Sequence, residues 1–172
     1  MSIDSYRQTQ TQTISAALAE AAGVGGLAPS IHNTQPWRWR VNGDTLELYA
    51  EPTRQLPASD PGGRMVLLSC GAALHHVRIA LAAHGWRVEV DRMPVLDRPR
   101  LLARLSLSGR LAVTREAMRL LHTIRIRHTD RRAVTDTTVT SGAIDAIRAA
   151  VEVEHACQIG RASCRERVSE CV

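Results

Sequence analysis

The chain of 172 residues contains no lysine and few aromatic residues. All 22 basic residues are arginine, and the aromatic residues are three Trp and two Tyr, with no Phe. A net charge of +5 would suit a nucleic-acid-binding protein if the basic residues gathered on one surface. They are spread along the chain instead, and no aromatic platform for stacking bases is visible. The composition therefore argues against nucleic acid as a partner.

Two features of the sequence argue against a secreted or membrane-spanning protein. Residues 1–12 are polar and contain no apolar signal-peptide core. The most apolar stretch, residues 66–83, is short for a bilayer span and includes two histidines and an arginine. We expect this stretch to be a buried core helix, and we expect a cytoplasmic protein with no membrane partner.

Familiar metal-binding and nucleotide-binding motifs are absent. Cys157, Cys164 and Cys171 recur every seven residues, which is not a zinc-ligand spacing, so we predict no metal site. Without a secretory signal the cysteines are expected to be free thiols. Neither a G-x-G-x-x-G motif nor a P-loop is present, so nucleotide binding by those loops is not expected.

Local patterns predict a mixture of helices and strands. Two alternating segments, 37–41 and 45–49, flank Asn42-Gly43, which predicts a β-hairpin with a type I′ turn. Further strands are predicted over residues 86–90 and 101–107, and helices over residues 13–22, 64–84 (followed by Gly85), 110–123 and 141–151 (with Ser141 as N-cap). Because helices and strands do not alternate regularly, we expect an α+β fold with a mixed or antiparallel sheet and surrounding helices.

The loop before the predicted hairpin carries the first motif of functional interest. It reads Ala28-Pro29-Ser30-Ile31-His32-Asn33-Thr34-Gln35-Pro36-Trp37. Prolines stiffen such a loop, and its short hydroxyl and amide side chains can cap backbone groups. The same side chains can match the donors and acceptors of a polar ligand at little entropic cost. We expect Trp37 to pack in the core and assign His32 no catalytic role.

A second motif, Arg127-His128-Thr129-Asp130-Arg131-Arg132, follows the predicted helix 110–123. Arginines beside a hydroxyl suit a phosphate dianion, which prefers charge-assisted and bidentate donors. Taken alone, the motif is more typical of a solvated basic turn.

Together the two motifs resemble those of the nitroreductases. The run A-P-S-x-x-N-x-Q-P-W is similar to their flavin-contacting loop, and the second motif is similar to their R-R/H-S/T-x-R/K phosphate motif. In ordinary nitroreductases the phosphate motif comes first, whereas here it follows the loop by about ninety residues. That order resembles the Acg-type nitroreductases, which look like a nitroreductase dimer fused into one chain. Residues 60–64 and 68–76 also resemble this family, and the resemblance covers roughly residues 13–157.

The resemblance implies an FMN cofactor held by both motifs. The residues assigned to FMN are Ser30, Asn33, Gln35, Arg127, Thr129 and Arg131. Those of the loop would contact the flavin ring and ribityl chain, and Arg127 and Thr129 would hold the phosphate. Arg131 would face the N1/O2 edge of the ring, where a fixed cation favours the reduced, negatively charged flavin.

The resemblance also implies how the chain is divided. Residues 1–120 would form a first nitroreductase-like half, and residues 121–158 would begin a second half that is truncated. Residues 159–168 resemble the translation of a DNA-sequencing adapter, so we expect residues 159–172 to be a non-native tail. Since the 66–83 helix would then expose the face meant for the missing half, a homodimer is expected.

The implied function is that of an FMN-dependent oxidoreductase. It would pass a hydride from NAD(P)H through FMN to a nitroaromatic or quinone-like acceptor. The alternatives are a flavoprotein that sequesters or stores FMN without turnover, and an inactive truncated fragment. No catalytic side chain is assigned, because FMN carries the chemistry and the spacing of Cys70 and His75 does not make a nucleophile–base pair.

Overall fold

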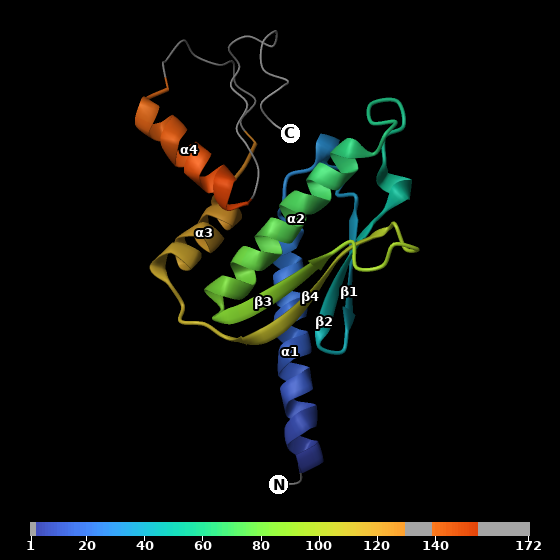
Figure 1. The fold of residues 1–172 in the computed structure, drawn as a ribbon, viewed down its shortest axis with the longest axis vertical. Helices are drawn as coiled ribbons and strands as arrows, with labels where there is room; N and C mark the ends of the chain where they lie inside the picture. Colours follow the sequence, from blue (N-terminus) through green and yellow to red (C-terminus); the bar gives the residue numbers. More distant parts are fainter. Residues whose placement is uncertain (1–2, 130–138, 155–172) are drawn as a thin grey trace. The chain divides into compact units, whose positions relative to one another are not determined.

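The computed structural model describes residues 3–129 and 139–154, which belong to two units, Met1–His128 and Thr129–Val172. The first unit contains three helices, α1 (Ile3–Gly25), α2 (Arg64–Ala83) and α3 (Arg115–Ile126), and the strands β1 (Trp37–Asn42), β2 (Thr45–Ala50), β3 (Trp86–Arg92) and β4 (Leu101–Arg110) (Figure 1). Two short 3-10 helices cover Ile31–Asn33 and Pro52–Arg54. In the described part of the second unit there is one helix, α4 (Ser141–Val153).

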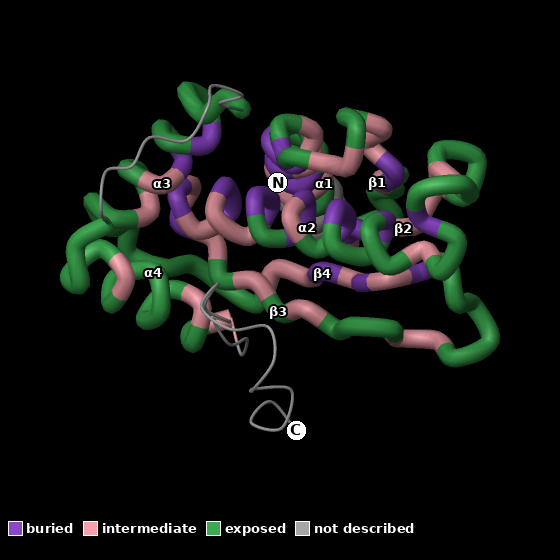
Figure 2. Tube along the Cα trace, turned by 90° about the horizontal axis from the view of Figure 1, so that it is seen from above, coloured by how far each residue is buried: buried purple, intermediate pink, exposed green. Residues whose placement is uncertain are grey.

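The four strands form one antiparallel sheet in the order β1-β2-β4-β3. Helices α1 and α2 pack against each other and lie along one side of this sheet (Figures 1 and 2). The arrangement confirms the predicted α+β class with an antiparallel sheet. Along each strand, successive side chains therefore point alternately toward the helices and away from them.

The core of the first unit lies between the helix pair and the sheet. Fully buried side chains come from α1, α2, β2 and β4, and these elements carry most of the purple in Figure 2. The residues are Leu18, Ala21, Leu46, Leu48, Cys70, Ala73, Val77, Ala80, Leu81, Leu101, Ala103 and Leu105. Trp37 is buried too, as predicted for the start of the hairpin. Many of these residues are small, so the backbones of the two helices can approach closely.

At Gly25, α1 lies close to its neighbours. A Cβ built at this position would lie 2.7 Å from Val77 Cγ2 and 3.2 Å from the ring of Trp39. A larger residue would therefore push α1 away from α2 and from β1. The predicted end of this helix at Gly23 was wrong, because burial of Val24 continues the apolar face formed by Leu18 and Ala21.

Helix α1 also starts earlier than predicted, at Ile3 instead of Thr13. Residues 3–12 are mostly polar, so they show no apolar periodicity from which a helix could be predicted.

The hairpin is confirmed, but its turn is shifted by one residue. Asn42 pairs with Thr45, so the two central residues are Gly43 and Asp44. Gly43 has a φ of 61°, and Asp44 is not among the residues with positive φ. Glycine at the first central position suits a type II′ turn, whereas the predicted type I′ turn needs positive φ at both positions.

The N-terminal ends of the last two helices differ from the prediction. Thr114 caps α3, since its hydroxyl accepts a hydrogen bond of 3.1 Å from the amide of Ala117. The preceding residues up to Arg110 extend β4 and pair with β3, so α3 begins at Arg115 and not at Arg110. In α4 the cap is Thr140 and not Ser141, with a bond of 3.3 Å from the amide of Ala143.

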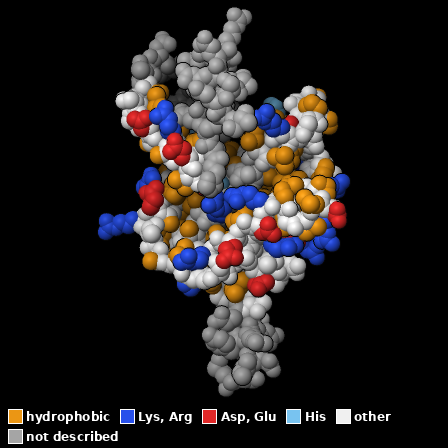
Figure 3. All heavy atoms as spheres, viewed as in Figure 1, with side chains coloured by type: hydrophobic (Ala, Val, Ile, Leu, Met, Phe, Trp, Pro, Cys, Tyr) orange, Lys and Arg blue, Asp and Glu red, His pale blue; other side chains and the backbone are white. Residues whose placement is uncertain are grey.

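Helix α2 is the one helix among the described residues that is long and apolar enough to cross a membrane. Its mean hydropathy is 1.5, and half of the apolar window is buried within the structure. Core helices meet the same criteria of length and composition. On the side shown in Figure 3, basic and acidic side chains are interspersed with hydrophobic ones.

Candidate functional site

The loop from Gly26 to Pro36 joins α1 to β1 and is closed on itself by hydrogen bonds. The Ser30 hydroxyl accepts a bond of 2.9 Å from the amide of Gln35. The Ser30 carbonyl accepts a bond of 3.0 Å from the amide of Asn33. The Gln35 side chain donates a longer bond of 3.4 Å to the carbonyl of Gly26. Ser30 and Gln35, which were predicted to contact FMN, therefore also stabilise the conformation of the loop.

Three residues of this loop adopt left-handed backbone conformations. The φ angles are 45° at His32, 56° at Asn33 and 48° at Gln35. Asn tolerates this region better than most residues, and each such conformation costs about 1–3 kcal/mol in an L-residue that does not favour it. The surrounding hydrogen bonds maintain this strained shape. Strain of this kind concentrates at ligand-binding sites, which makes the loop the leading candidate site.

Helix α2 anchors the inner side of the loop. The buried Ser69 hydroxyl accepts a bond of 3.3 Å from the amide of Ile31 and donates one of 2.7 Å to the carbonyl of Met65. The buried Cys70 thiol donates to the carbonyl of Pro36, with a distance of 3.3 Å. Burial raises the pKa of Cys70 to about 11. The thiol is therefore protonated at neutral pH, which agrees with assigning it no catalytic role.

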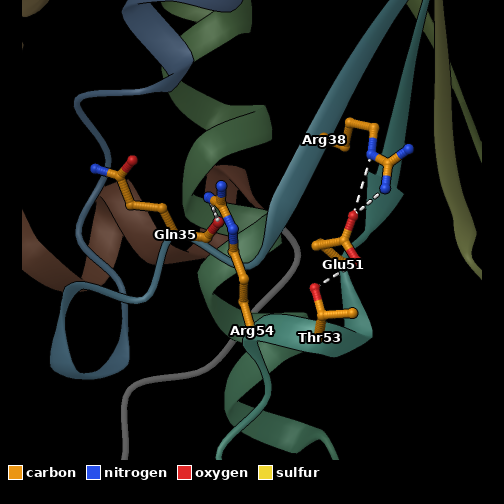
Figure 4. A network of polar contacts seen from close by, with 5 residues as sticks. All are labelled: Gln35, Arg38, Glu51, Thr53 and Arg54. Atoms are coloured by element: carbon orange, nitrogen blue, oxygen red, sulfur yellow. Dashed lines mark hydrogen bonds and ion pairs between the residues drawn. The ribbon is translucent and has the colours of Figure 1, made fainter.

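The outer side of the loop is held from the segment after β2. Arg54 donates a bond of 2.9 Å to the carbonyl of Gln35, and the amide of Glu51 donates one of 2.9 Å to the carbonyl of Pro36. Figure 4 shows Arg54 reaching the main chain of Gln35 while Glu51 faces Arg38 on the other side of β1. The sequence analysis missed both residues: Arg54 belongs to no recognised motif, and Ser69, although it lies in the segment 68–76 that resembles the family, was assigned no role.

Arg127 lies beside the loop although it is one hundred residues from Leu27 in the sequence. It follows α3, and its Nη2 donates a bond of 3.4 Å to the carbonyl of Leu27. Nearby, His76 of α2 is 8% exposed, and its Nδ1 has no hydrogen-bond partner. Burial, and then the charges of His75 and Arg127, lower the pKa of His76. The first arginine of the predicted phosphate motif thus lies beside the predicted flavin loop.

The predicted site residues are placed as follows. Ser30, Asn33, Gln35 and Arg127 all belong to the first unit and lie on or beside the loop. The exposed side chain of Asn33 bonds to no described residue, and neither does the hydroxyl hydrogen of Ser30. Thr129 is the first residue of the second unit, and Arg131 lies outside the described residues.

The described residues contain no group of three His, Cys, Asp or Glu side chains that could hold a metal ion. The polar groups near the loop are instead a hydroxyl, an amide and a guanidinium. Such groups recognise a polar organic ligand with a phosphate better than they would a cation.

Comparison with known proteins gives partial matches to proteins of Mycobacterium tuberculosis. A protein named "Putative NAD(P)H nitroreductase" is 60% identical over 67 residues, which are 39% of this chain and 20% of that protein. The "Putative NAD(P)H nitroreductase acg" is 41% identical over 93 residues, 54% of this chain and 28% of that protein. An uncharacterized protein is 40% identical over 90 residues, 50% of this chain and 26% of that protein. No family model matches the chain.

The matches thus span between 20% and 28% of the length of these relatives. Identities of 40–60% over such lengths are those of homologous proteins. Over about half of its length this chain is homologous to proteins named as NAD(P)H nitroreductases, Acg among them, which confirms the resemblance predicted from its two motifs.

Proposed function

We propose that the chain is part of an FMN-dependent oxidoreductase that passes a hydride from NAD(P)H through FMN to a nitroaromatic or quinone-like acceptor. The observation that carries this proposal is the bond from Arg127 to the carbonyl of Leu27, which brings the arginine of one motif to the loop of the other. The names of the relatives support a nitroreductase-type reaction.

The chemistry of the loop fits one wall of an FMN site. The Ser30 hydroxyl can still donate, and the Asn33 amide can both donate and accept, so these groups suit ribityl hydroxyls and the pyrimidine edge of a flavin. Thr34 adds a buried hydroxyl oxygen that has no partner among the described residues. Because Ser69 and Arg54 hold the loop in place, little entropy is lost when it binds a ligand.

Arg127 supplies the charge that this site needs. Its side chain is exposed and forms no ion pair with a described carboxylate, so its guanidinium is available for a phosphate group. Thr129 and Arg131 would complete the phosphate and ring contacts, as the resemblance implies.

FMN supplies the acceptance and donation of the hydride when it is bound. The chain's own residues orient it and supply the electrostatic environment. Gln35 contributes mainly through its backbone carbonyl and its bond to Gly26, which keep Ser30 and Asn33 in position. Cys70 takes no part, because its protonated thiol is bonded to the main chain.

A hybrid protein tests the proposal. Residues 1–158 of this chain replace the corresponding part of the relative that is 60% identical, and FMN absorbance is measured after gel filtration. We expect a yellow protein that oxidises NAD(P)H in the presence of a nitroaromatic or a quinone. The Asn33→Ala variant should retain less FMN, while Asn42→Ala, which changes an exposed hairpin residue, should retain as much as the parent.

The outcomes separate the alternatives. A folded hybrid without FMN would overturn the proposed cofactor. A yellow hybrid that turns over no NAD(P)H with any acceptor would overturn the oxidoreductase and favour a protein that stores FMN.

A further inference from the structure

A pocket of about 250 Å³ lies on the first unit, and none of its lining residues belongs to the loop just described. Four of its lining residues are charged: Arg38, Arg40, Glu51 and Arg100. Arg38 pairs with Tyr49 across the hairpin and Arg40 with Glu47, while Trp37 and Trp39, which alternate with the two arginines along β1, lie in or against the core. The alternation of the strands therefore places the two arginines on the face of the sheet opposite α1 and α2.

One arginine of the pocket is neutralised within the protein. Arg38 donates hydrogen bonds to the carboxylate of Glu51, which also accepts a bond of 2.9 Å from the hydroxyl of Thr53 (Figure 4). The bonds from Arg38 and Thr53 lower the pKa of Glu51 to about 2. Glu51 is therefore ionised at physiological pH, and its charge cancels that of Arg38.

The other two arginines carry charge that no described carboxylate neutralises directly. The guanidinium groups of Arg40 and Arg100 form no hydrogen bond or ion pair with a described residue, although the charge of Arg40 acts on the carboxylate of Glu47, which lies opposite it in the hairpin. The nearest candidate, Glu47, already accepts a bond of 2.8 Å from the hydroxyl of Tyr49 and one of 2.9 Å from Arg104. Two guanidinium groups at one concave site are the usual recognition elements for a phosphate or carboxylate.

The rest of the pocket is apolar. Ala50, Pro52 and the ring of Tyr49 form this side. The hydroxyl of Tyr49 is bonded to Glu47, so the ring is held in one orientation. A site with a basic end and an apolar wall suits an anion that carries a hydrophobic group.

We propose that this pocket binds a small phosphate monoester with an aromatic or aliphatic group, and that Arg40 and Arg100 hold its phosphate. A dianion matches the two positive charges better than a carboxylate does, because Glu47 and Glu51 are already hydrogen-bonded to Arg104 and Arg38. The volume of 250 Å³ is just below the range of about 300–1,000 Å³ typical of pockets for drug-sized ligands, so one ring or a short chain fits and a whole dinucleotide does not. The proposal does not depend on FMN binding, because no lining residue belongs to the loop from Gly26 to Pro36.

The test is a calorimetric titration of the full 172-residue chain with phenyl phosphate, and separately with inorganic phosphate and benzoate. We expect saturable binding of one phenyl phosphate per chain, tighter than that of either other anion. Arg40→Gln and Arg100→Gln should each weaken it about tenfold, the loss expected for one charge-assisted contact. Arg100→Lys should retain part of the affinity, and thermal melts of the variants should match that of the parent.

Two controls change the charge equally elsewhere. Arg87→Gln alters β3 of the same sheet, and Arg125→Gln alters an exposed arginine in the last turn of α3. Both should bind phenyl phosphate as the parent does. No saturable binding, or an equal loss in a control variant, would overturn the proposal. Equal affinity for inorganic phosphate would refute the apolar wall, and tighter binding of benzoate would refute the choice of a phosphate.

Discussion

Substitution of Ser30 by alanine tests whether one hydroxyl holds the loop in its strained shape. The change removes the acceptor of the 2.9 Å bond from the amide of Gln35. That amide is half-buried, and an unsatisfied buried donor costs about 1–3 kcal/mol. Gln35 itself has a φ of 48°, so its strained backbone should relax once the bond is lost. We expect a loss of about 1–3 kcal/mol in the free energy of unfolding.

Urea unfolding followed by tryptophan fluorescence measures this loss. Trp37 and Trp39 follow the loop directly and lie in or against the core, so their emission reports on the structure next to it. The midpoint should fall while the m-value stays unchanged, because the surface exposed on unfolding is the same. Ser108→Ala, at an exposed position of β4, should change stability by no more than about 0.5 kcal/mol. If Ser30→Ala behaved like Ser108→Ala, Ser30 would not be what holds the loop.

Further predictions concern the core, one histidine and one cysteine. Gly25→Ala should destabilise the chain by about 1–3 kcal/mol through overpacking, because the added Cβ would lie 2.7 Å from Val77 Cγ2. Gly23 has open space around it, so Gly23→Ala should be neutral or stabilising by up to about 1 kcal/mol in the same urea assay. The pKa of His76 is lowered in the folded chain, so around pH 6.5 and below the unfolded chain binds more protons than the folded chain. The free energy of unfolding should therefore decrease as pH falls from 7.5 to 5.5, and the His76→Gln variant should lose less stability over the same range. Parallel pH profiles of the two proteins would contradict this. With the three other cysteines replaced by serine, Cys70, whose pKa is raised to about 11, should react with iodoacetamide far more slowly in the folded chain than in urea at the same pH, and equal rates would show that the thiol is accessible.

Much of the fold could be predicted because its signals are local. The hairpin follows from two alternating segments with a glycine between them, and α2 from an apolar stretch that ends before Gly85. The start of α3 could not be predicted in this way. Arg110 belongs to β4 because it pairs with Trp86 and lies over its ring, with 3.9 Å between the guanidinium carbon and the ring centroid. A contact between residues so far apart in sequence leaves no local pattern.

Residues of the candidate site, too, could be predicted only where they belong to a local sequence pattern. Ser30 and Asn33 were found because they belong to a contiguous motif. Ser69 and Arg54, which hold the loop from α2 and from the segment after β2, contact residues 38 and 19 positions away. Their roles depend on how the elements pack, and neither residue type is unusual where it occurs. The predicted boundaries after residues 120 and 158 stay predictions, as does the non-native origin of residues 159–172.

The central claim is that Arg127 and the loop from Gly26 to Pro36 form one FMN site. FMN titration of the hybrid protein, followed by the quenching of flavin fluorescence, tests it most directly. Arg127→Ala removes the proposed phosphate contact and should raise the Kd for FMN about ten- to hundredfold, while Arg125→Ala, an exposed arginine in the last turn of α3, should leave it within about twofold. Equal Kd values for the two variants would contradict the claim.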